Sequence, residues 1–288
     1  MEKPIFTIIG STGNIGSELT DLLSQTEVSI RAVLRNFKRA KKLSNVVWIQ
    51  ADMNDISLIE PTLAGTDCLF LLTGNRPGFG KTQIDIIKTA EKLGVKHIVK
   101  LSALGASPRT KSPLAYEHWE AEQALEKSSM TWTILRPHVF MQNWLGEVAE
   151  TVRNEAAIYA AIGEGKVPFI DARDIAAEAL LHPEKHRSKK YVLTGGKAIG
   201  YSELAEALSK ATGKEIVYNS LSMDAMGSRM EKQGISSKMI DSFLALAAYQ
   251  KAGGATARTS DDVKNILARE PRSVFDFAKD YQAHFKNA

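Results

Sequence analysis

Short apolar runs alternate with amphipathic stretches along the first half of the chain. The runs are rich in β-branched residues, as expected of strands buried on both faces of a sheet, and they occupy residues 5–9, 28–34, 46–50, 68–72, 97–101 and 131–135. The stretches between them have apolar positions at helical spacing, over residues 15–23, 81–93 and 116–127. Strands and helices that alternate with short connections predict an α/β fold built on a doubly wound parallel sheet.

A glycine-rich turn joins the first predicted strand to the first predicted helix. It contains Gly10, Gly13 and Gly16, at the spacing Gly-x-x-Gly-x-x-Gly rather than the commoner Gly-x-Gly-x-x-Gly. A helix N-terminus offers free N–H groups and a partial positive charge to a pyrophosphate, and glycine lets the ligand approach closely. The position therefore favours a dinucleotide-binding Rossmann domain over the alternative, a glycine-rich turn without a ligand.

The pattern changes in the second half of the chain. A loop is expected at residues 163–166, a short strand at 167–170, and then an amphipathic helix capped by Asp171 with Ile175, Ala176, Ala179 and Leu180 on its inner face. Further strands are expected at 191–193 and 216–218, and helices at 201–212, 223–249 (interrupted near Gly234) and 262–267. We predict a Rossmann domain over residues 1–195 and a smaller, mostly helical, substrate-covering lobe over 196–288, joined by parts of 140–170.

The end of the second strand carries a base where NAD-binding folds commonly carry an acid. Such folds place an Asp or Glu about 20 residues beyond the glycines to hold the ribose hydroxyls. Here Arg35 stands there, followed by Lys38, Arg39, Lys41 and Lys42. A guanidinium suits a ribose 2′-phosphate, which predicts NADP, with NADPH preferred over NADH. We interpret Arg35 as a ligand contact and Lys41 and Lys42 as a solvated helix face.

Asp52 follows the third strand. It could accept a hydrogen bond from the adenine amino group, or it could cap the helix that begins near Ile56.

Composition narrows the function further. Hydrophobic residues at 44% and charged residues at 24% fit an ordinary globular enzyme, and 37 basic against 33 acidic residues give a net charge of +4, too even to indicate nucleic acid as a partner. The single cysteine, Cys68, lies in an apolar run and is expected to be a buried core thiol in a reducing compartment. The sequence shows no signal peptide and no membrane-length apolar run, so we expect a cytoplasmic protein.

Several segments together resemble the NmrA-like, atypical short-chain dehydrogenase/reductases. The segments are Gly10–Gly16, Val33–Asn36, Ala51–Asp52, Glu117–Glu122, Trp132–Pro137, Asp171–Ala176 and Tyr191–Gly195, and the resemblance runs from about residue 5 to residue 218. Within that group the chain is most similar to NADPH-dependent quinone reductases and triphenylmethane dye reductases. The resemblance implies a set of cofactor contacts: Gly10, Ser11, Thr12, Gly13, Asn14, Ile15, Arg35, Thr73, Gly74, Asn75, Pro137, His138, Val139, Phe140, Met141 and Gln142. We add Asp52 and Ser102, at strand ends, to the cofactor site.

The chain departs from most short-chain dehydrogenases in its catalytic residues. These enzymes use a tyrosine with a lysine four positions later, whereas Tyr116 is followed at that spacing by Glu120, and no other tyrosine here has such a lysine. Candidates to shape the reaction are Tyr116, His118, His138 and Asn143; His118 could equally be a surface or packed histidine. Trp144 is expected to pack in the core rather than line a pocket. His182 and His186 have metal-like spacing but no third ligand, so no metal is expected.

Two functions remain. The first is an NADPH-dependent oxidoreductase that transfers hydride to a quinone, a dye or a similar planar electrophilic acceptor without a Tyr–Lys pair. The second is a non-catalytic NAD(P)-binding redox sensor that reports to a protein partner. Sugar-nucleotide epimerase chemistry is disfavoured by the missing pair. The oligomeric state is not indicated, and a homodimer stays open.

Overall fold

The computed structural model describes residues 3–74, 76–175 and 181–287. Contacts between residues divide the chain into two compact units. The first comprises Met1–His138, Ala172–Leu193 and Asn265–Ala268, and the second Val139–Asp171, Thr194–Lys264 and Arg269–Ala288. The boundary at residue 195 and the roles that the sequence suggests for the two parts stay predictions.

The first unit is built on a seven-stranded parallel sheet with the strand order β3-β2-β1-β4-β5-β6-β8. Its strands are β1 (Ile5–Ile9), β2 (Ser29–Leu34), β3 (Val46–Gln50), β4 (Cys68–Leu71), β5 (His97–Leu101), β6 (Thr131–Pro137) and β8 (Lys189–Leu193). The order reverses direction beside β1, which is the switch point where open α/β sheets bind ligands. The predicted α/β, doubly wound Rossmann sheet is confirmed.

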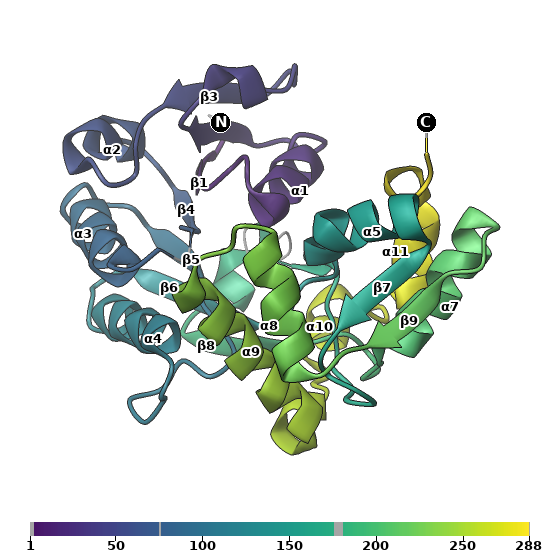
Figure 1. The fold of residues 1–288 in the computed structure, drawn as a ribbon. Coiled ribbons are helices and arrows are strands. Elements are labelled where there is room, and N and C mark those ends of the chain that lie inside the picture. Colours follow the sequence, from purple (N-terminus) through teal and green to yellow (C-terminus); the bar gives the residue numbers. More distant parts are fainter. Residues whose placement is uncertain (1–2, 75, 176–180, 288) are drawn as a thin grey trace. The chain divides into compact units, whose positions relative to one another are not determined.

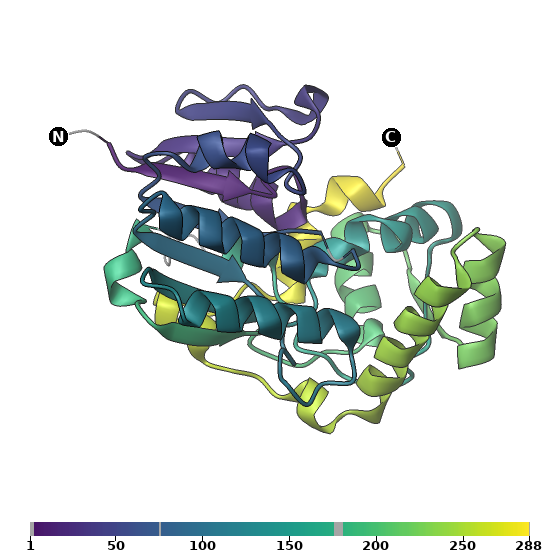
Figure 2. The ribbon, with the colours of Figure 1, turned by 90° about the vertical axis from the view of Figure 1, so that its left-hand side faces the viewer.

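Four described helices cover the sheet of the first unit. They are α1 (Asn14–Leu23), α2 (Ile56–Leu63), α3 (Phe79–Lys92) and α4 (Pro113–Glu126). Figures 1 and 2 show α2, α3 and α4 side by side on one face of the sheet and α1 on the other. Local chemistry sets their ends: Ser112 caps α4 ahead of Pro113, and Gly94, just beyond α3, has a φ of +74°. Cys68 is buried as predicted, and burial raises the pKa of its thiol.

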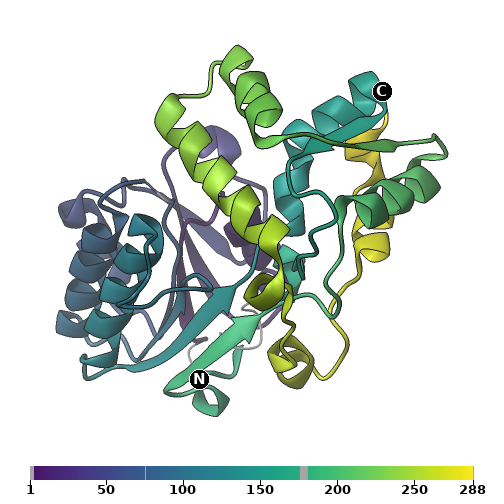
Figure 3. The ribbon, with the colours of Figure 1, turned by 60° about the horizontal axis from the view of Figure 1, so that its bottom comes forward.

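The second unit packs helices around a small parallel sheet of β7 (Ala157–Ala160) and β9 (Val217–Ser220). Its helices are α5 (Glu147–Glu155), α7 (Tyr201–Thr212), α8 (Met223–Lys232), α9 (Ser237–Ala252) and α11 (Val274–Asp280), while α10 (Asp262–Leu267) spans the division between the units. Figure 3 shows α7 and α11 beside this sheet. Trp144 packs in the core between Phe169 and Phe277, at ring-centroid distances of 4.6 and 5.5 Å, which confirms its predicted core role.

The second half of the chain departs from the expected elements in several places. The strand predicted at residues 167–170 is wrong: Val167 and Ile170 make only isolated bridges, to Ile199 and Phe140. Of the helix predicted to follow Asp171, the structure describes a short 3-10 turn, η3 (Ala172–Asp174), and Ala176, Ala179 and Leu180 lie outside the described residues. The sequence also missed α5, β7 and α11. The break near Gly234 is confirmed, since this glycine has a φ of +76° between α8 and α9.

None of the helices in the described part of the chain combines the length and the apolar character that crossing a membrane requires.

A buried histidine in the first unit makes stability depend on pH. The ring nitrogens of His97 lie 2.7 Å from the Thr131 hydroxyl and 3.0 Å from the Thr133 hydroxyl. Burial, and then the charge of Arg187, lower the pKa of His97 to about 4. The unfolded chain takes up this proton at a pH of about 6.5, so stability is complete above that pH and falls as the pH decreases towards 4, by about 3 kcal/mol.

The variant His97→Gln is therefore expected to lose less stability at acidic pH, because glutamine keeps hydrogen-bonding capacity without titrating. Urea unfolding at neutral and mildly acidic pH measures the difference. His284→Gln, at an exposed position, is the matched control and is expected to follow the unmodified chain. Identical acid sensitivity in all three proteins would contradict the assignment.

Candidate functional site

Two glycines of the first turn are required by packing. Gly10 follows β1 with a φ of +83°, and a Cβ there would lie 2.6 Å from the carbonyl oxygen of Leu72. A Cβ on Gly16 would lie only 2.1 Å from the carbonyl oxygen of Gly10. Because these neighbours are backbone atoms, no side chain fits at either position. The two glycines hold α1 against the ends of β1 and β4.

The third glycine is different, because packing does not demand it. Gly13 has a φ of −79°, which any residue can adopt, and a Cβ there would meet only the carbonyl oxygen of Gly10, at 3.5 Å. It stands at the N-cap of α1, where no described side chain accepts a hydrogen bond from the helix and no acidic residue occupies the first turn. Free N–H groups beneath an open glycine form a suitable cradle for a phosphate anion.

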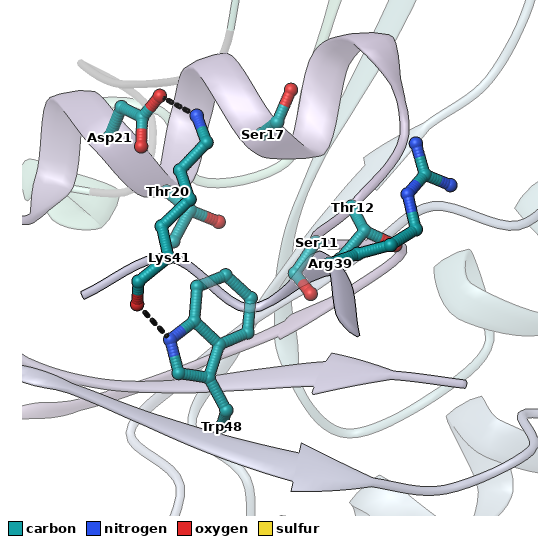
Figure 4. A pocket seen from close by; sticks show the side chains of 8 residues that line it. All are labelled: Ser11, Thr12, Ser17, Thr20, Asp21, Arg39, Lys41 and Trp48. Carbon is teal, nitrogen blue, oxygen red and sulfur yellow. Dashed lines mark hydrogen bonds and ion pairs between the residues drawn. The ribbon is translucent and has the colours of Figure 1, made fainter. Parts of the chain in front are cut away.

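A pocket of about 220 Å³ lies beside this turn, between α1, β3 and the segment after β2. This is smaller than the roughly 300–1,000 Å³ of a complete small-molecule site, so the pocket has room for part of a dinucleotide. Its lining residues are shown in Figure 4: Ser11, Thr12, Ser17, Thr20, Asp21, Arg39, Lys41 and Trp48. Most of these side chains are polar, as a site for a phosphate and its sugar requires.

The pocket contains one cation that is already paired and one that is not. Lys41 forms an ion pair with Asp21, and its carbonyl oxygen accepts a hydrogen bond of 2.8 Å from the Trp48 indole. Figure 4 shows Arg39 beside Ser11 and Thr12, and within the described residues its guanidinium has no ion-pair partner. The Ser11 hydroxyl donates a hydrogen bond of 2.6 Å to the carbonyl oxygen of Val33, so its proton is already used within the fold.

The pocket partly changes the interpretation of the basic segment. Arg35 is exposed directly after β2 and does not line the pocket. The solvated helix face predicted for Lys41 and Lys42 is wrong, because the only helical turn there is η1 (Phe37–Arg39) and Lys41 lines the pocket. Sequence reasoning noted Arg39 without assigning it a role and missed Trp48. In the sequence, the signal for Arg39 is its closeness to Arg35, and the signal for Trp48 is its closeness to the end of β3.

Asp52 lies exposed after β3, where it accepts hydrogen bonds from the backbone N–H and the side-chain amide of Asn54. Asp55, rather than Asp52, caps α2 by accepting from the N–H of Ser57 at 3.0 Å. The capping alternative for Asp52 is therefore wrong, and its adenine contact stays a prediction.

The segment after β4 is fixed by α3 and α4. The Thr73 hydroxyl accepts a hydrogen bond of 2.8 Å from Gln83 of α3. The Glu117 carboxylate accepts from the N–H groups of Gly78, at 3.1 Å, and Gly80, at 2.7 Å, so a side chain of α4 occupies the N-terminus of α3. Gly74 is exposed with nothing within 4 Å of an added Cβ, and Asn75 lies outside the described residues.

A buried carboxylate links the ends of β5 and β6. Glu122 of α4 is fully buried; it accepts a hydrogen bond of 2.5 Å from the Ser102 hydroxyl and one of 2.9 Å from Nε of Arg136, whose second guanidinium nitrogen pairs with the other carboxylate oxygen. Lys190 of β8 lies 3.8 Å from the same carboxylate. This pairing raises the pKa of Arg136. The hydroxyl of Ser102 thus serves the fold, and its expected cofactor contact stays a prediction.

The two catalytic candidates of α4 lie in different surroundings. Tyr116 is 39% exposed, with its ring 5.3 Å from that of Trp119. His118 is buried 4.6 Å from the Phe79 ring, and its Nδ1 lies 3.2 Å from Nζ of Lys100. Burial, and then the charge of Lys100, lower the pKa of His118 to about 2. Among the two interpretations of His118, these contacts favour a packed, neutral histidine over a proton donor.

The predicted cofactor contacts from 137 to 142 fall in both units, and the reaction candidate Asn143 follows them directly. Pro137 and a buried His138 belong to the first. Val139, Phe140, Met141, Gln142 and Asn143 belong to the second. Met141 is part of the second unit's core, and the Gln142 side chain donates to Asp171 at 2.8 Å. Asn143 is exposed in η2 (Met141–Leu145). Roles for these residues toward a ligand stay predictions.

The described residues contain no group of three or more His, Cys, Asp or Glu side chains arranged to hold a metal. His186 lies 2.8 Å from the Tyr191 hydroxyl, and His182 lies 3.6 Å from Glu184.

Comparison with known proteins agrees with this geometry. The NmrA-like family matches residues 2–278. An NAD(P)H azoreductase of Xenophilus azovorans is 32% identical over 284 residues, 96% of this chain and 98% of that protein.

Solved structures share the fold of this chain. Triphenylmethane reductase of Citrobacter sp. superposes with a TM-score of 0.84 at 23% identity, covering 97% of this chain and 99% of that one. The NADPH-dependent quinone oxidoreductase of Escherichia coli, complexed with NADPH, gives 0.81 at 25% identity over 96% and 99%. NmrA, a negative transcriptional regulator in complex with NADP, gives 0.78 at 15% identity over 98% and 96%.

Proposed function

Because the chain belongs to the NmrA-like family, we propose that it is an NADPH-dependent oxidoreductase that transfers hydride to a quinone or a similar planar, electrophilic acceptor. The observation that carries this proposal is the open Gly13 at the uncapped N-terminus of α1, next to the basic pocket of Arg39. One feature suits a pyrophosphate and the other suits a ribose 2′-phosphate.

The residues of the first unit would hold NADPH as follows. The N–H groups of the first turn of α1 bind the pyrophosphate, and Gly13 leaves the space for it. Arg39 and Arg35 bind the 2′-phosphate from the segment after β2, with Thr12 beside Arg39. Ion pairing to Asp21 fixes Lys41 at the pocket wall, where its remaining donors contribute positive potential. The fit is chemical as well as spatial, since these groups are hydrogen-bond donors or cations.

When bound, NADPH supplies the hydride, and the protein supplies position. The chain has no tyrosine with a lysine four residues later, and His118 is buried and neutral beside Lys100. A quinone needs little acid catalysis because it is already electrophilic, and water can protonate the reduced product. Catalysis by this chain then consists mainly of orienting the nicotinamide against the acceptor.

The acceptor class follows from what the relatives share. The proteins named above include an NAD(P)H azoreductase, a quinone oxidoreductase and a triphenylmethane reductase. Azo dyes, quinones and triphenylmethane dyes are conjugated, electrophilic molecules that accept electrons. We infer that this chain takes an acceptor with the same properties.

Purified protein is expected to consume NADPH in the presence of small quinones or an azo dye, faster than NADH at equal concentration. Loss of NADPH absorbance measures the reaction, and the Gly16→Ala variant serves as an inactive control. Binding of NADPH without turnover across quinones, azo dyes and triphenylmethane dyes would contradict the enzyme.

That last outcome would instead support a redox sensor that binds NAD(P) and reports to a protein partner. The missing Tyr–Lys pair and the likeness in fold to NmrA favour this second function.

A further inference from the structure

A lysine is fully buried inside the first unit. Lys100 belongs to β5, two residues before Ser102, and its side chain has no exposed surface. Its ammonium group lies 3.2 Å from Nδ1 of His118 and 3.3 Å from the carbonyl oxygen of Leu101. In the described structure no carboxylate lies within ion-pair distance of it. A buried amine without a carboxylate partner is costly, and such groups often serve a function.

The charges near Lys100 come from several elements. Glu122 and His118 face it from α4, and Arg136 faces it from β6. From α3, the Phe79 ring packs against His118 rather than adding a charge. Lys190 of β8 lies 3.8 Å from the carboxylate of Glu122. Since Arg136 and Ser102 already bind Glu122, that carboxylate offsets only part of the cost of burying the lysine.

Lys100 also lies at a structural junction. Its amine contacts the carbonyl oxygen of the last residue of β5, directly before Ser102, and it contacts α4 through His118. The same helix holds the N-terminus of α3 through Glu117. Lys100 therefore joins the end of β5 to α4 at the carboxyl edge of the sheet, where open α/β sheets bind ligands.

We propose that Lys100 and His118 form a positioning pair at the carboxyl end of β5, and that dinucleotide binding is coupled to proton uptake by Lys100. This inference rests on the proposed function. The proton comes from solvent and converts the neutral amine to an ammonium, which donates to His118 Nδ1 and to the Leu101 carbonyl.

The direction of the coupling follows from electrostatics. Burial is the main cause that lowers the pKa of Lys100 to about 7, so amine and ammonium coexist near neutral pH. An anionic dinucleotide at this edge stabilises the ammonium, because charges interact strongly where water is excluded. By reciprocity, protonated Lys100 strengthens binding of the dinucleotide. If binding raises the pKa of Lys100 by about one unit, affinity falls about tenfold as the pH rises from about 6 to about 9.

Titration calorimetry with NADP tests this coupling. Binding is measured at slightly alkaline pH in two buffers with different ionisation enthalpies, which gives the number of protons taken up. The unmodified protein is expected to take up a fraction of a proton that is absent in Lys100→Met, and to lose affinity more steeply with pH than that variant. Lys96→Met, an exposed lysine just before the same strand, is the matched control and is expected to keep the uptake.

Two outcomes separate this inference from the proposed function. Equal proton uptake by the unmodified protein and by Lys100→Met overturns the coupling alone. Failure of the unmodified protein to bind NADP or NAD overturns the proposed function and the coupling together.

A second measurement needs no substitution, in case Lys100→Met does not fold. Carbon-13 NMR of labelled lysine side chains is expected to show one lysine that titrates near neutral pH, with a midpoint that rises when NADP is added. A midpoint that NADP leaves unchanged overturns the inference, as does the lack of any lysine titrating in this range.

Discussion

Gly16→Ala is expected to destabilise the first unit by about 3 kcal/mol or more and to abolish NADPH binding. The new Cβ would lie 2.1 Å from the carbonyl oxygen of Gly10, 2.7 Å from its carbonyl carbon and 2.9 Å from Cα of Ser11. All three are backbone atoms of the turn itself. Relieving the overlap must displace either the turn or the start of α1, and both are needed for the phosphate cradle.

Gly13→Ala is the matched variant that separates packing from ligand binding. A Cβ at Gly13 meets ordinary contact distances, and its φ of −79° suits alanine. We expect stability to change by about 1 kcal/mol or less, the usual range for an N-cap substitution. Affinity for NADPH is expected to fall about 100-fold, or ~2.7 kcal/mol, because the methyl group enters the space proposed for the pyrophosphate.

Thermal unfolding and NADPH titration of both variants provide the measurement. Unchanged NADPH affinity in Gly13→Ala would show that no ligand lies over this glycine. A fully stable Gly16→Ala that still bound NADPH would show that the turn tolerates displacement and is not the cradle.

The sheet of the first unit could be predicted because its signals are local. The strand Val46–Gln50, for example, is four apolar residues followed by Gln50, and its predicted bounds agree with the structure. Helix ends followed equally local rules, since Gly94 and Gly234 adopt positive φ where helices were expected to stop. By contrast, β7 is a four-residue strand, Ala157–Ala160, half of it alanine. It exists because it pairs with β9, sixty residues later, and no local signal records that pairing.

The site shows the same division between local and distant information. The glycine turn and the basic segment could be recognised in the sequence because each consists of residues close together in the chain. The partners of Ser102 and His118 were not, because Glu122 and Lys100 reach them only through the packing of α4 on the sheet. The charged residues of α4 have the spacing of a solvated helix face, yet Glu122 is fully buried. Its partners Ser102, Arg136 and Lys190, which belong to other segments of the chain, explain why this carboxylate is inside.

The choice between NADPH and NADH is expected to depend on Arg39 at least as much as on Arg35. Both arginines are exposed, but Arg39 lines the pocket beside Thr12 and Arg35 does not. Arg39→Glu replaces a cation with an anion where the 2′-phosphate is proposed to bind. Because the site is exposed, exchanging the attraction for a repulsion is expected to cost about 2 kcal/mol, so NADPH affinity should fall about 30-fold. NADH has no 2′-phosphate, so its affinity should fall by about threefold or less, through the loss of general positive potential.

Arg35→Glu is expected to act in the same direction with an equal or smaller effect, and Lys42→Glu, an exposed base outside the pocket lining, to change both affinities little. Fluorescence titration of each variant with both dinucleotides supplies the comparison. Raising the salt concentration should narrow the difference between the dinucleotides in the unmodified protein, because screening weakens exposed charge pairs. Equal losses for NADPH and NADH in Arg39→Glu would remove the basis for assigning the 2′-phosphate to this pocket, while a selective loss only in Arg35→Glu would assign it to the end of β2 instead.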